Sequence, residues 1–288
     1  MNAREAHARL ARETVEALTQ GGYRLADGRW VSIAEWLAEA KRSTRVFTPD
    51  ELAALEGETN ARTAAPPEIR VLNASTLTAA RALTDDTGHE PLCLNFASAR
   101  NPGGGFLKGA QAQEEALARA TGLYACLREA PAYYTANRRC DTTLYTDHMI
   151  HTPGVPVFRD DDGNLLAEPY RVSVVSAPAV NRSALKKNEP AMLREARSTM
   201  RRRMRRLLAL ARHQGHRRLV LGAWGCGVFG QEPAHVAADF RDLLTGEGRF
   251  AGAFDTVVFA VLDPTPGAPA FEAFRRSFGV VSQEAGST

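Results

Sequence analysis

The residues best suited to chemistry lie between Gly103 and Glu115, where a run of three glycines precedes two adjacent glutamates. Gly103, Gly104 and Gly105 have no Cβ, so their backbone can reach positive φ and a ligand can approach their amides. Glu114 and Glu115 stand at the expected start of a helix and place two carboxylates beside those amides. Amide donors next to carboxylates indicate chemistry on a nucleotide-like molecule.

The two glutamates are expected to do different jobs. Neighbouring helical residues point about 100° apart, so Glu114 and Glu115 cannot flank one reacting bond from opposite sides. The pair therefore supplies one carboxylate for the reacting atom. The alternative is structural, because acidic residues in a first helical turn stabilise the helix dipole.

A second glycine cluster spans residues 222–230 and lies between an apolar segment and an expected helix. In open α/β sheets, loop amides beyond the carboxyl ends of strands bind phosphates without a lysine. The cluster lacks the Gly-Lys-Ser/Thr ending of a P-loop, so it does not indicate an NTPase. A glycine-rich turn that serves only chain connectivity is the alternative.

The first cluster and its flanks resemble a known family. Residues 95–102, Asn-Phe-Ala-Ser-Ala-Arg-Asn-Pro, lead into Gly-Gly-Gly, a short spacer and Gln-Glu-Glu, as in the bacterial-type poly(ADP-ribose) glycohydrolases. The likeness covers most of the chain from about residue 69 onward, including 222–230, and more loosely the amino-terminal part. It implies a macrodomain, a three-layer α/β/α module with a mixed sheet that holds ADP-ribose.

The resemblance implies roles for individual residues. Glu115 would protonate the leaving ribose oxygen and then deprotonate the attacking water, while Glu114 would hold ribose hydroxyls. Gln113 would orient the same site or cap the helix, and Asn101 would bind ribose or serve the turn. Ser75 departs from the acidic residue that related macrodomains often place against the adenine amino group. The other residues expected to bind substrate are Thr76, Gly103, Gly104 and Gly105, and Gly225, Cys226, Gly227, Val228, Phe229 and Gly230, which would wrap the diphosphate, with Phe229 against the distal ribose.

An acid that works near neutral pH needs a pKa above the usual glutamate value of about 4.3. For Glu115 a helix amino terminus acts against this, whereas burial favours it. A closed ribose pocket walled by Phe106, Leu107 and Phe229 would let desolvation prevail.

Composition excludes several other classes. The chain has 288 residues and a net charge of +3, which is too mild to indicate a nucleic-acid binder. Four separated cysteines form no Cys-x-x-Cys pair and indicate a reducing compartment without structural zinc. The amino terminus lacks the apolar stretch of a signal peptide, and no run approaches the roughly 20 apolar residues of a membrane span. We expect a cytoplasmic protein without metal or other cofactor, and without direct contact to membrane or nucleic acid.

The elements that position these residues follow from apolar periodicity. From residue 69 onward short apolar runs alternate with amphipathic segments, which predicts a layered α/β sheet. Strands are expected at 69–73, 91–96, 170–176, 218–221 and 256–262, and helices at 77–85, 114–130, 191–214, 233–244 and 269–278. Residues 67–288 would form the catalytic domain and residues 1–66 a helical accessory region packed on it.

Within the accessory region we expect a helix at 6–19 and a hairpin turn at Asp27-Gly28. A capping box of Ser32 and Glu35 would begin a helix that buries Trp36 and Leu37. A connector would follow at 59–67.

Three other signals receive plainer interpretations. His148 and His151 have no nearby third ligand and are expected to be ordinary loop histidines. Residues 160–163, Asp-Asp-Asp-Gly, lack the spacing of a calcium loop and predict a turn. The basic run from Arg201 to Arg206 could contact a polyanionic polymer or form a solvated helix face.

These observations favour a hydrolase that cleaves the ribose-ribose bonds of poly(ADP-ribose) from chain ends and releases ADP-ribose. Its substrates would be the polymer or ADP-ribosylated proteins. A non-catalytic ADP-ribose reader is the alternative from the binding class, although phosphate binding gains nothing from two anions. A mono-ADP-ribosyl or O-acetyl-ADP-ribose hydrolase would share the pocket and differ in leaving group.

Overall fold

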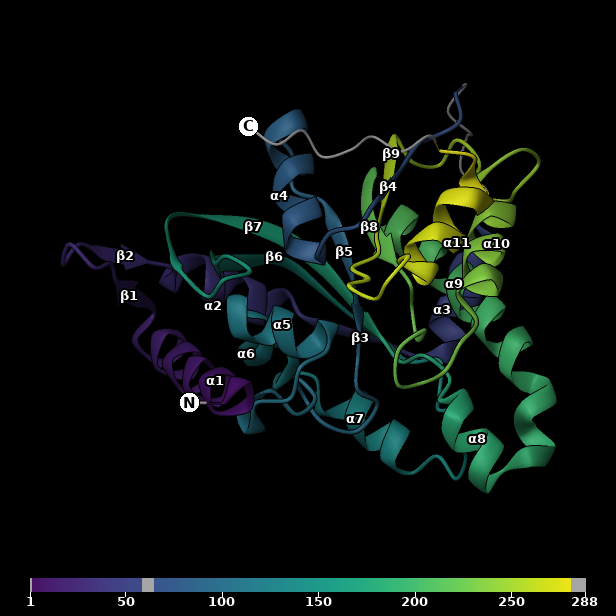
Figure 1. The fold of residues 1–288 in the computed structure, drawn as a ribbon, viewed down its shortest axis with the longest axis horizontal. Coiled ribbons are helices and arrows are strands. Elements are labelled where there is room, and N and C mark those ends of the chain that lie inside the picture. Colours follow the sequence, from purple (N-terminus) through teal and green to yellow (C-terminus); the bar gives the residue numbers. More distant parts are fainter. Residues whose placement is uncertain (1, 59–64, 281–288) are drawn as a thin grey trace.

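The centre of the computed structural model, which describes residues 2–58 and 65–280, is a seven-stranded mixed sheet. The strands follow the order β3-β6-β7-β5-β8-β9-β4 (Figure 1). In that order they are Arg45–Phe47, Met149–Arg159, Leu165–Ala177, Leu92–Phe96, Arg218–Gly222, Thr256–Ala260 and Glu68–Leu72. The strands from β7 to β4 run parallel, whereas β3 and β6 lie antiparallel to their neighbours.

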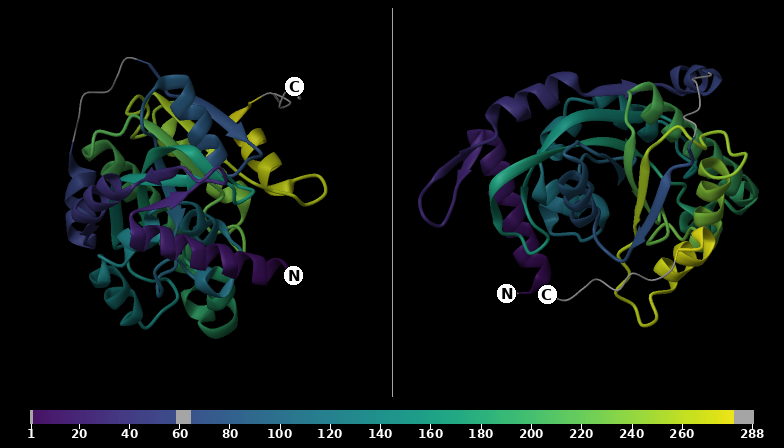
Figure 2. Two further views of the ribbon diagram at one scale, coloured as in Figure 1. Left: turned by 90° about the vertical axis from the view of Figure 1, so that its left-hand side faces the viewer. Right: turned by 90° about the horizontal axis from the view of Figure 1, so that it is seen from above.

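Helices cover both faces of the sheet. Successive strand residues point to opposite sides, and apolar residues on both sides need to be buried. On one face Leu94 and Leu221 lie in the larger hydrophobic core, and on the other Cys93 and Val220 lie in a second one. The first face carries α3 Pro49–Gly57, α9 Ala196–His213, α10 Pro233–Leu244 and α11 Pro269–Phe278. The second carries α4 Thr76–Thr87, α5 Gln113–Ala120, α6 Leu123–Leu127 and α7 Pro131–Arg138. Figure 2 shows helices on both sides of the curved sheet, which confirms the expected three-layer arrangement.

All five expected strands are present, but the sheet also contains β6 and the short edge strand β3. The strand β6 escaped prediction because Pro153, Gly154 and Pro156 are typical of turns. The pairing of β6 with β7 shifts register between Thr152 and Val155, so an irregularity accommodates these residues within the strand.

The amino-terminal part contributes to the main sheet as well as covering it. It contains α1 Ala3–Gln20, the hairpin β1 Gly22–Arg24 and β2 Trp30–Ser32, α2 Ala34–Ser43, β3 and α3. The helix expected at 6–19 and the hairpin turn at Asp27-Gly28 are confirmed. Residues 59–64 of the expected connector lie outside the described residues, and the division of the chain near residue 66 stays a prediction.

Some local predictions were wrong. The helix α2 is capped by Ile33 without a side-chain hydrogen bond, so Ser32 and Glu35 form no capping box. Leu37 is buried as expected, but Trp36 is only partly buried.

Two helices that the sequence predicted as continuous are divided. The helix expected at 114–130 breaks at Thr121, whose backbone bridges Val157 of β6. The helix expected at 191–214 begins as a 3-10 segment, Pro190–Glu195, before α9. A tertiary contact interrupts the periodic pattern in the first case, and a change of helix type interrupts it in the second. The helices α7, α8 Arg182–Asn188 and α3 were not predicted.

The structure also shows where the acidic segment 160–163 and the basic run Arg201 to Arg206 lie. Residues 160–163 form the predicted turn between β6 and β7, where the Gly163 N–H donates to the Asp160 carbonyl at 3.1 Å. The basic run is only partly a solvated face: Arg203 is fully buried, whereas the side chains of Arg201, Arg202 and Arg205 are about two-fifths exposed and pair with carboxylates. Across the described ranges no helix is long and apolar enough to cross a membrane.

Candidate active site

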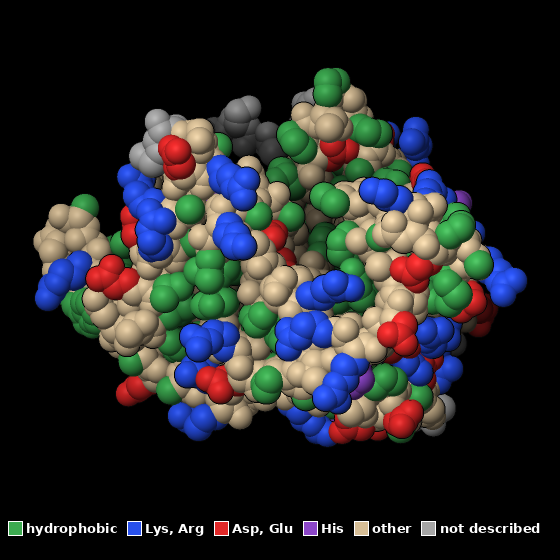
Figure 3. Space-filling view, turned by 90° about the horizontal axis from the view of Figure 1, so that it is seen from below, with side chains coloured by type: hydrophobic (Ala, Val, Ile, Leu, Met, Phe, Trp, Pro, Cys, Tyr) green, Lys and Arg blue, Asp and Glu red, His purple; other side chains and the backbone are tan. Residues whose placement is uncertain are grey.

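The two glycine clusters come together because their strands are neighbours. The strands β5 and β8 pair in parallel, so the loops that follow them leave the same edge of the sheet. A Cβ at Gly222, at the end of β8, would overlap the Ala260 carbonyl oxygen of β9 and lie 3.1 Å from the Phe96 ring at the end of β5, so the strand ends approach closely here. Both loops lie below the sheet in Figure 1, and the face seen from that side in Figure 3 is hollowed near its centre.

Gln113 fixes the start of α5 against the sheet. Its amide nitrogen donates to the Leu94 carbonyl at 2.8 Å and to Thr76 Oγ1 at 3.0 Å. Its Oε1 accepts from the Phe96 N–H at 2.9 Å. The residue does not cap α5, whose N-cap Ala112 makes no side-chain bond. In this structure Gln113 and Thr76 therefore position the helix, and their expected contacts with substrate stay predictions.

The carboxyl groups of Glu114 and Glu115 converge on Gly104. A Cβ at residue 104 would overlap Glu115 Oε1 and lie 3.0 Å from Glu114 Oε2. Glu115 Oε1 accepts from the Gly105 N–H at 2.9 Å, and Glu114 Oε2 accepts from the Ser98 N–H at 2.7 Å. Although adjacent helical residues point in different directions, the glutamate side chains are long enough for both carboxyl groups to reach Gly104. Gly104 itself has a φ of 60°, which glycine adopts without strain.

The two carboxyls differ in burial. Glu114 is 3% exposed, whereas Glu115 is partly exposed. Burial raises the pKa of Glu114 to about 8. The hydrogen bond from the Ser98 N–H acts to lower this pKa, and the charge of Glu115 acts to raise it further. Glu114 is therefore protonated at neutral pH. The sequence argument required a raised pKa at Glu115, whereas the carboxyl whose pKa burial raises is that of Glu114, to which the family resemblance gives the ribose hydroxyls. The requirement at Glu115 stays a prediction.

Two tyrosines that the sequence did not single out lie near enough to Glu114 for its charge to add to burial in raising the pKa of their hydroxyls. Tyr133 and Tyr134 of α7 are buried, and neither hydroxyl has a hydrogen-bond partner among the described residues. Asn95 donates to Glu114 Oε1 at 3.4 Å, and its own Oδ1 has no partner within the described ranges. Buried polar atoms without partners are uncommon in folded proteins, so these three atoms near Glu114 are consistent with a functional position. The sequence signal is a Tyr-Tyr pair after Pro131, which by itself indicates only a buried helix face.

The loop of the first cluster turns as predicted, with one correction. Asn101 is exposed, and its carbonyl accepts from the Gly104 N–H at 3.0 Å. Phe106 cannot wall an open pocket, because it is fully buried with Ala11 and Ala118 beneath α1. Leu107 is 48% exposed and stays a candidate wall.

The loop of the second cluster presents three consecutive backbone donors. The N–H groups of Gly227, Val228 and Phe229 have no hydrogen-bond acceptor in the part of the chain that the structure describes. Gly225 and Gly230 have φ values of 78° and 69° and shape the turn on either side. Successive free amides in such a turn form a concave anion site, and α10 follows with its positive dipole end.

The rest of this loop is anchored below the donors. The Gln231 amide nitrogen donates to the Val180 carbonyl at 2.8 Å, and the Ser183 N–H donates to the Phe229 carbonyl at 3.1 Å. Cys226 is partly exposed, and Val228 is 86% exposed at the tip. A loop fixed at its base with free amides at its tip can receive a diphosphate.

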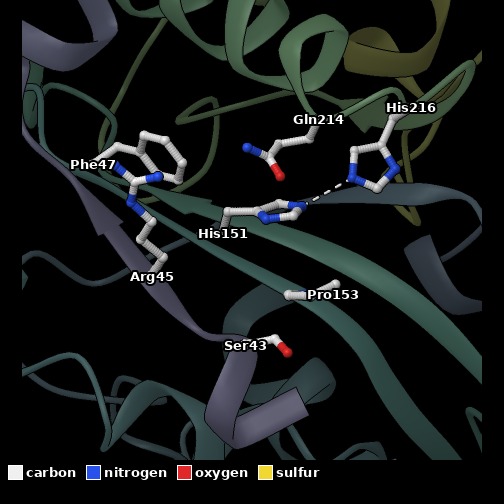
Figure 4. A pocket seen from close by; sticks show the side chains of 7 residues that line it. All are labelled: Ser43, Arg45, Phe47, His151, Pro153, Gln214 and His216. Carbon is white, nitrogen blue, oxygen red and sulfur yellow. Dashed lines mark hydrogen bonds between the residues drawn. The ribbon is translucent and has the colours of Figure 1, made fainter. Parts of the chain in front are cut away.

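A separate cavity of about 290 Å³ opens beside the edge strand β3 (Figure 4). His151 lies in β6 and is buried, so its prediction as a loop histidine was wrong, whereas His148 does lie in a loop. The Nε2 atoms of His151 and His216 are 2.9 Å apart, and burial lowers the pKa of His151 to about 3. A hydrogen bond between two neutral imidazoles accounts for this pair. Arg45 also lines the cavity, and the described residues contain no cluster of three or more metal-ligating side chains.

Comparison with known proteins adds a family relation to this geometry. A family model described as "Microbial-type PARG, catalytic domain" matches residues 11–160. No curated protein matches the chain.

Solved structures resemble the chain over nearly its whole length. Poly(ADP-ribose) glycohydrolase from Thermomonospora curvata is 53% identical with a TM-score of 0.91, covering 95% of this chain and 100% of that chain. The same glycohydrolase bound to the inhibitor ADP-HPD is 51% identical with a TM-score of 0.89, covering 94% and 99%. The Deinococcus radiodurans glycohydrolase in complex with ADP-ribose is 45% identical with a TM-score of 0.78, covering 84% and 96%. The expected macrodomain-like fold is thereby confirmed.

The absence of a side chain at residue 104 can be tested by Gly104→Ala. The substitution should lower the free energy of unfolding by about 2 to 3 kcal/mol, because it adds both backbone strain and an overlap with Glu115. Gly88→Ala is the matched control, since Gly88 has a φ of 66° but a Cβ at that position would meet no atom within 4 Å. Denaturant unfolding measures both variants. An equal loss in the two would show that strain alone acts at residue 104.

The protonation of Glu114 makes stability depend on pH. Because its pKa is raised to about 8 on folding, its contribution to folding is complete in acid and is lost as the pH rises toward 8. From about pH 5 to about pH 8, the wild-type chain should therefore lose about 4 kcal/mol of unfolding free energy relative to Glu114→Gln. Urea unfolding at several pH values measures this, with Glu168→Gln at an exposed position as the control. A pH-independent difference between wild type and Glu114→Gln would show that Glu114 is ionised in the folded chain.

Proposed function

The chain belongs to the microbial-type poly(ADP-ribose) glycohydrolases, and from this membership we infer that it hydrolyses the ribose-ribose O-glycosidic bonds of poly(ADP-ribose) and releases ADP-ribose. The observation that carries the assignment is the convergence of two carboxyls of different burial on Gly104, beside a loop with three free amides. A reader of ADP-ribose would need the amides alone.

Glu115 is the catalytic acid and base in this proposal. It is the more exposed carboxyl, and the Gly105 N–H orients its Oε1 at 2.9 Å. Substrate that covers Glu115 removes water from it, as the protein does for Glu114, and this favours the protonated acid. Glu115 gives its proton to the leaving ribose oxygen as the glycosidic bond breaks. Water then attacks the anomeric carbon and loses its proton to the same carboxylate.

The positive charge that develops on the sugar is stabilised by nearby negative charge. The carboxylate left after proton transfer and the diphosphate in the second loop both lie on the substrate's side of the site. Glu114, protonated at neutral pH, can donate a hydrogen bond to a ribose hydroxyl as well as accept one. Phe229, partly buried in the diphosphate loop, would pack on the distal ribose.

The position of the amino-terminal helix α1 supports the proposal that the polymer is cleaved from its chain ends. Arg4 donates through Nε to the Lys108 carbonyl at 3.0 Å, and Thr14 donates to the Arg119 carbonyl at 2.6 Å. These bonds hold α1 against the loop and helix that carry the glutamates. We propose that residues 1–66 act as an accessory region that closes one side of the ribose site, so that a terminal unit enters more readily than an internal one.

The cysteines bear on the location of the protein, and the proposed activity bears on its partners. Cys93, Cys126, Cys140 and Cys226 are all free thiols, which supports a reducing, cytoplasmic location. The polymer or ADP-ribosylated proteins would be the substrates, and ADP-ribose the product.

Replacement of Glu115 tests the mechanism. Glu115→Gln should lower ADP-ribose release from purified poly(ADP-ribose) by at least about 10²-fold, because glutamine can accept the Gly105 N–H but cannot transfer the proton. Binding of ADP-ribose, measured by calorimetry, should persist. Glu129→Gln, at an exposed residue paired with Lys41, is the matched control.

Parallel assays decide between the proposed activity and its alternatives. A chelator should leave release by the wild-type chain unchanged. A wild-type chain that binds ADP-ribose but releases none from the polymer would be a reader. Faster turnover of serine-linked ADP-ribose or O-acetyl-ADP-ribose would assign the other hydrolase activities.

The products formed early in the reaction test the preference for chain ends. With long polymer in excess, the soluble product should be monomeric ADP-ribose, because each cleavage removes a terminal unit. Short oligomers as the main early product would contradict this preference. Chromatography of the soluble products measures the distribution.

A further inference from the structure

Tyr145 has a backbone conformation that a bulky residue rarely adopts. Its φ is 57°, and in the described ranges only Ala268 is another non-glycine residue with positive φ. Such residues persist only where surrounding contacts hold them, and they gather at functional sites. Tyr145 lies in the segment between α7 and β6, which the sequence did not single out.

The buried Arg203 of α9 holds this segment. Its Nη2 donates to the Tyr145 carbonyl at 2.8 Å and to the Leu144 carbonyl at 2.5 Å. Its Nη1 donates to the Pro178 carbonyl at 3.0 Å, and its Nε to Asp147 Oδ1 at 2.8 Å. One guanidinium that is fully buried thus fixes the backbone on both sides of the Tyr145 side chain.

Asp147 balances the charge of this arginine and gathers two more. Arg202 and Arg206 also bond to Asp147, each at 2.5 Å. Burial alone would raise the pKa of the Asp147 carboxyl, but the three arginines hold this pKa below its usual value. Glu56 of α3 pairs with Arg206 at 3.1 Å, so the network joins α3, α9 and the Tyr145 segment. Much of the basic run therefore serves as an internal anchor.

The ring of Tyr145 lies beside that of Phe229, which belongs to the proposed substrate site. The ring centroids of Tyr145 and Phe229 are 6.4 Å apart, with an angle of 38° between the ring planes. Both residues are partly exposed. The backbone of the two segments is also linked, since the Asn181 N–H donates to the Thr143 carbonyl at 3.1 Å while Ser183 bonds the Phe229 carbonyl. Tyr145 is thus placed to limit the movement of Phe229.

We propose that Tyr145 is a positioning residue of the glycohydrolase, whose ring holds Phe229 against the distal ribose, and that Arg203 maintains the left-handed backbone that this placement requires. The inference rests on the proposed function, because the contact of Phe229 with ribose belongs to that proposal. The free amides of the loop would still bind the diphosphate without Tyr145. Removal of the ring should therefore affect orientation of the sugar, and hence kcat, more than affinity.

Tyr145→Gly and Tyr145→Phe form the central test. Glycine accepts positive φ, so Tyr145→Gly removes the ring while relieving backbone strain. It should stay folded with an unfolding midpoint near that of wild type, lower kcat by on the order of 10²-fold, and change the Kd for ADP-ribose less than about threefold. Tyr145→Phe keeps the ring and should retain kcat within about threefold of wild type.

Two further variants separate positioning from stability. Ala268→Gly relieves strain at the other positive φ, at the start of α11, and should leave kcat unchanged. Arg203→Lys should lower kcat in the wild-type background and have little further effect on kcat in Tyr145→Gly, because it acts through the same residue.

The outcomes distinguish this inference from the function on which it rests. A wild-type chain without glycohydrolase activity would overturn the proposed function. An active wild type with unchanged kcat in Tyr145→Gly would overturn only the role of Tyr145. If Tyr145→Phe loses as much kcat as Tyr145→Gly, the hydroxyl and not the ring is responsible, and positioning through Phe229 is wrong.

Discussion

The site depends on the absence of a side chain at residue 104. Two long carboxyl side chains from adjacent helical positions meet above Gly104, and a single methyl group there would overlap one of them. The positive φ of Gly104 turns the loop so that the next amide, that of Gly105, reaches Glu115. Loop geometry and carboxyl placement therefore follow from one steric condition.

Burial then gives two chemically identical groups different properties. Glu114 faces the protein, where it accepts a backbone N–H and lies near tyrosine hydroxyls without partners among the described residues, and burial keeps it protonated at neutral pH. Glu115 is the more exposed of the two, and in the proposed mechanism substrate excludes water from it. In that mechanism, adjacent residues on one helical turn divide the tasks of holding a sugar and transferring a proton.

Charge inside the protein supports the site from the other face of the sheet. Arg203, Arg205 and Arg206 of α9 pair with Asp147 and Glu56, and these pairs tie the segment of Tyr145 to two helices. Because buried charges are stable only when paired, loss of one member would leave the others uncompensated. A run that looks basic in sequence thus adds little free positive charge at these positions.

The sequence by itself determined the features that depend on near neighbours along the chain. Five of the seven strands, the two glycine loops and the glutamate pair follow from periodicity, from glycine's freedom at positive φ and from the family motif. Only the tertiary structure decided which groups are buried. It placed the proline-containing β6 in the sheet, Phe106 beneath α1, His151 in a strand and the buried Arg203 in an ion-pair network around Asp147. It also separated the pKa of Glu114 from that of an exposed carboxyl. The physical reason is that strand pairing and desolvation arise from residues distant in sequence, whereas turns and periodic faces arise from residues within a few positions.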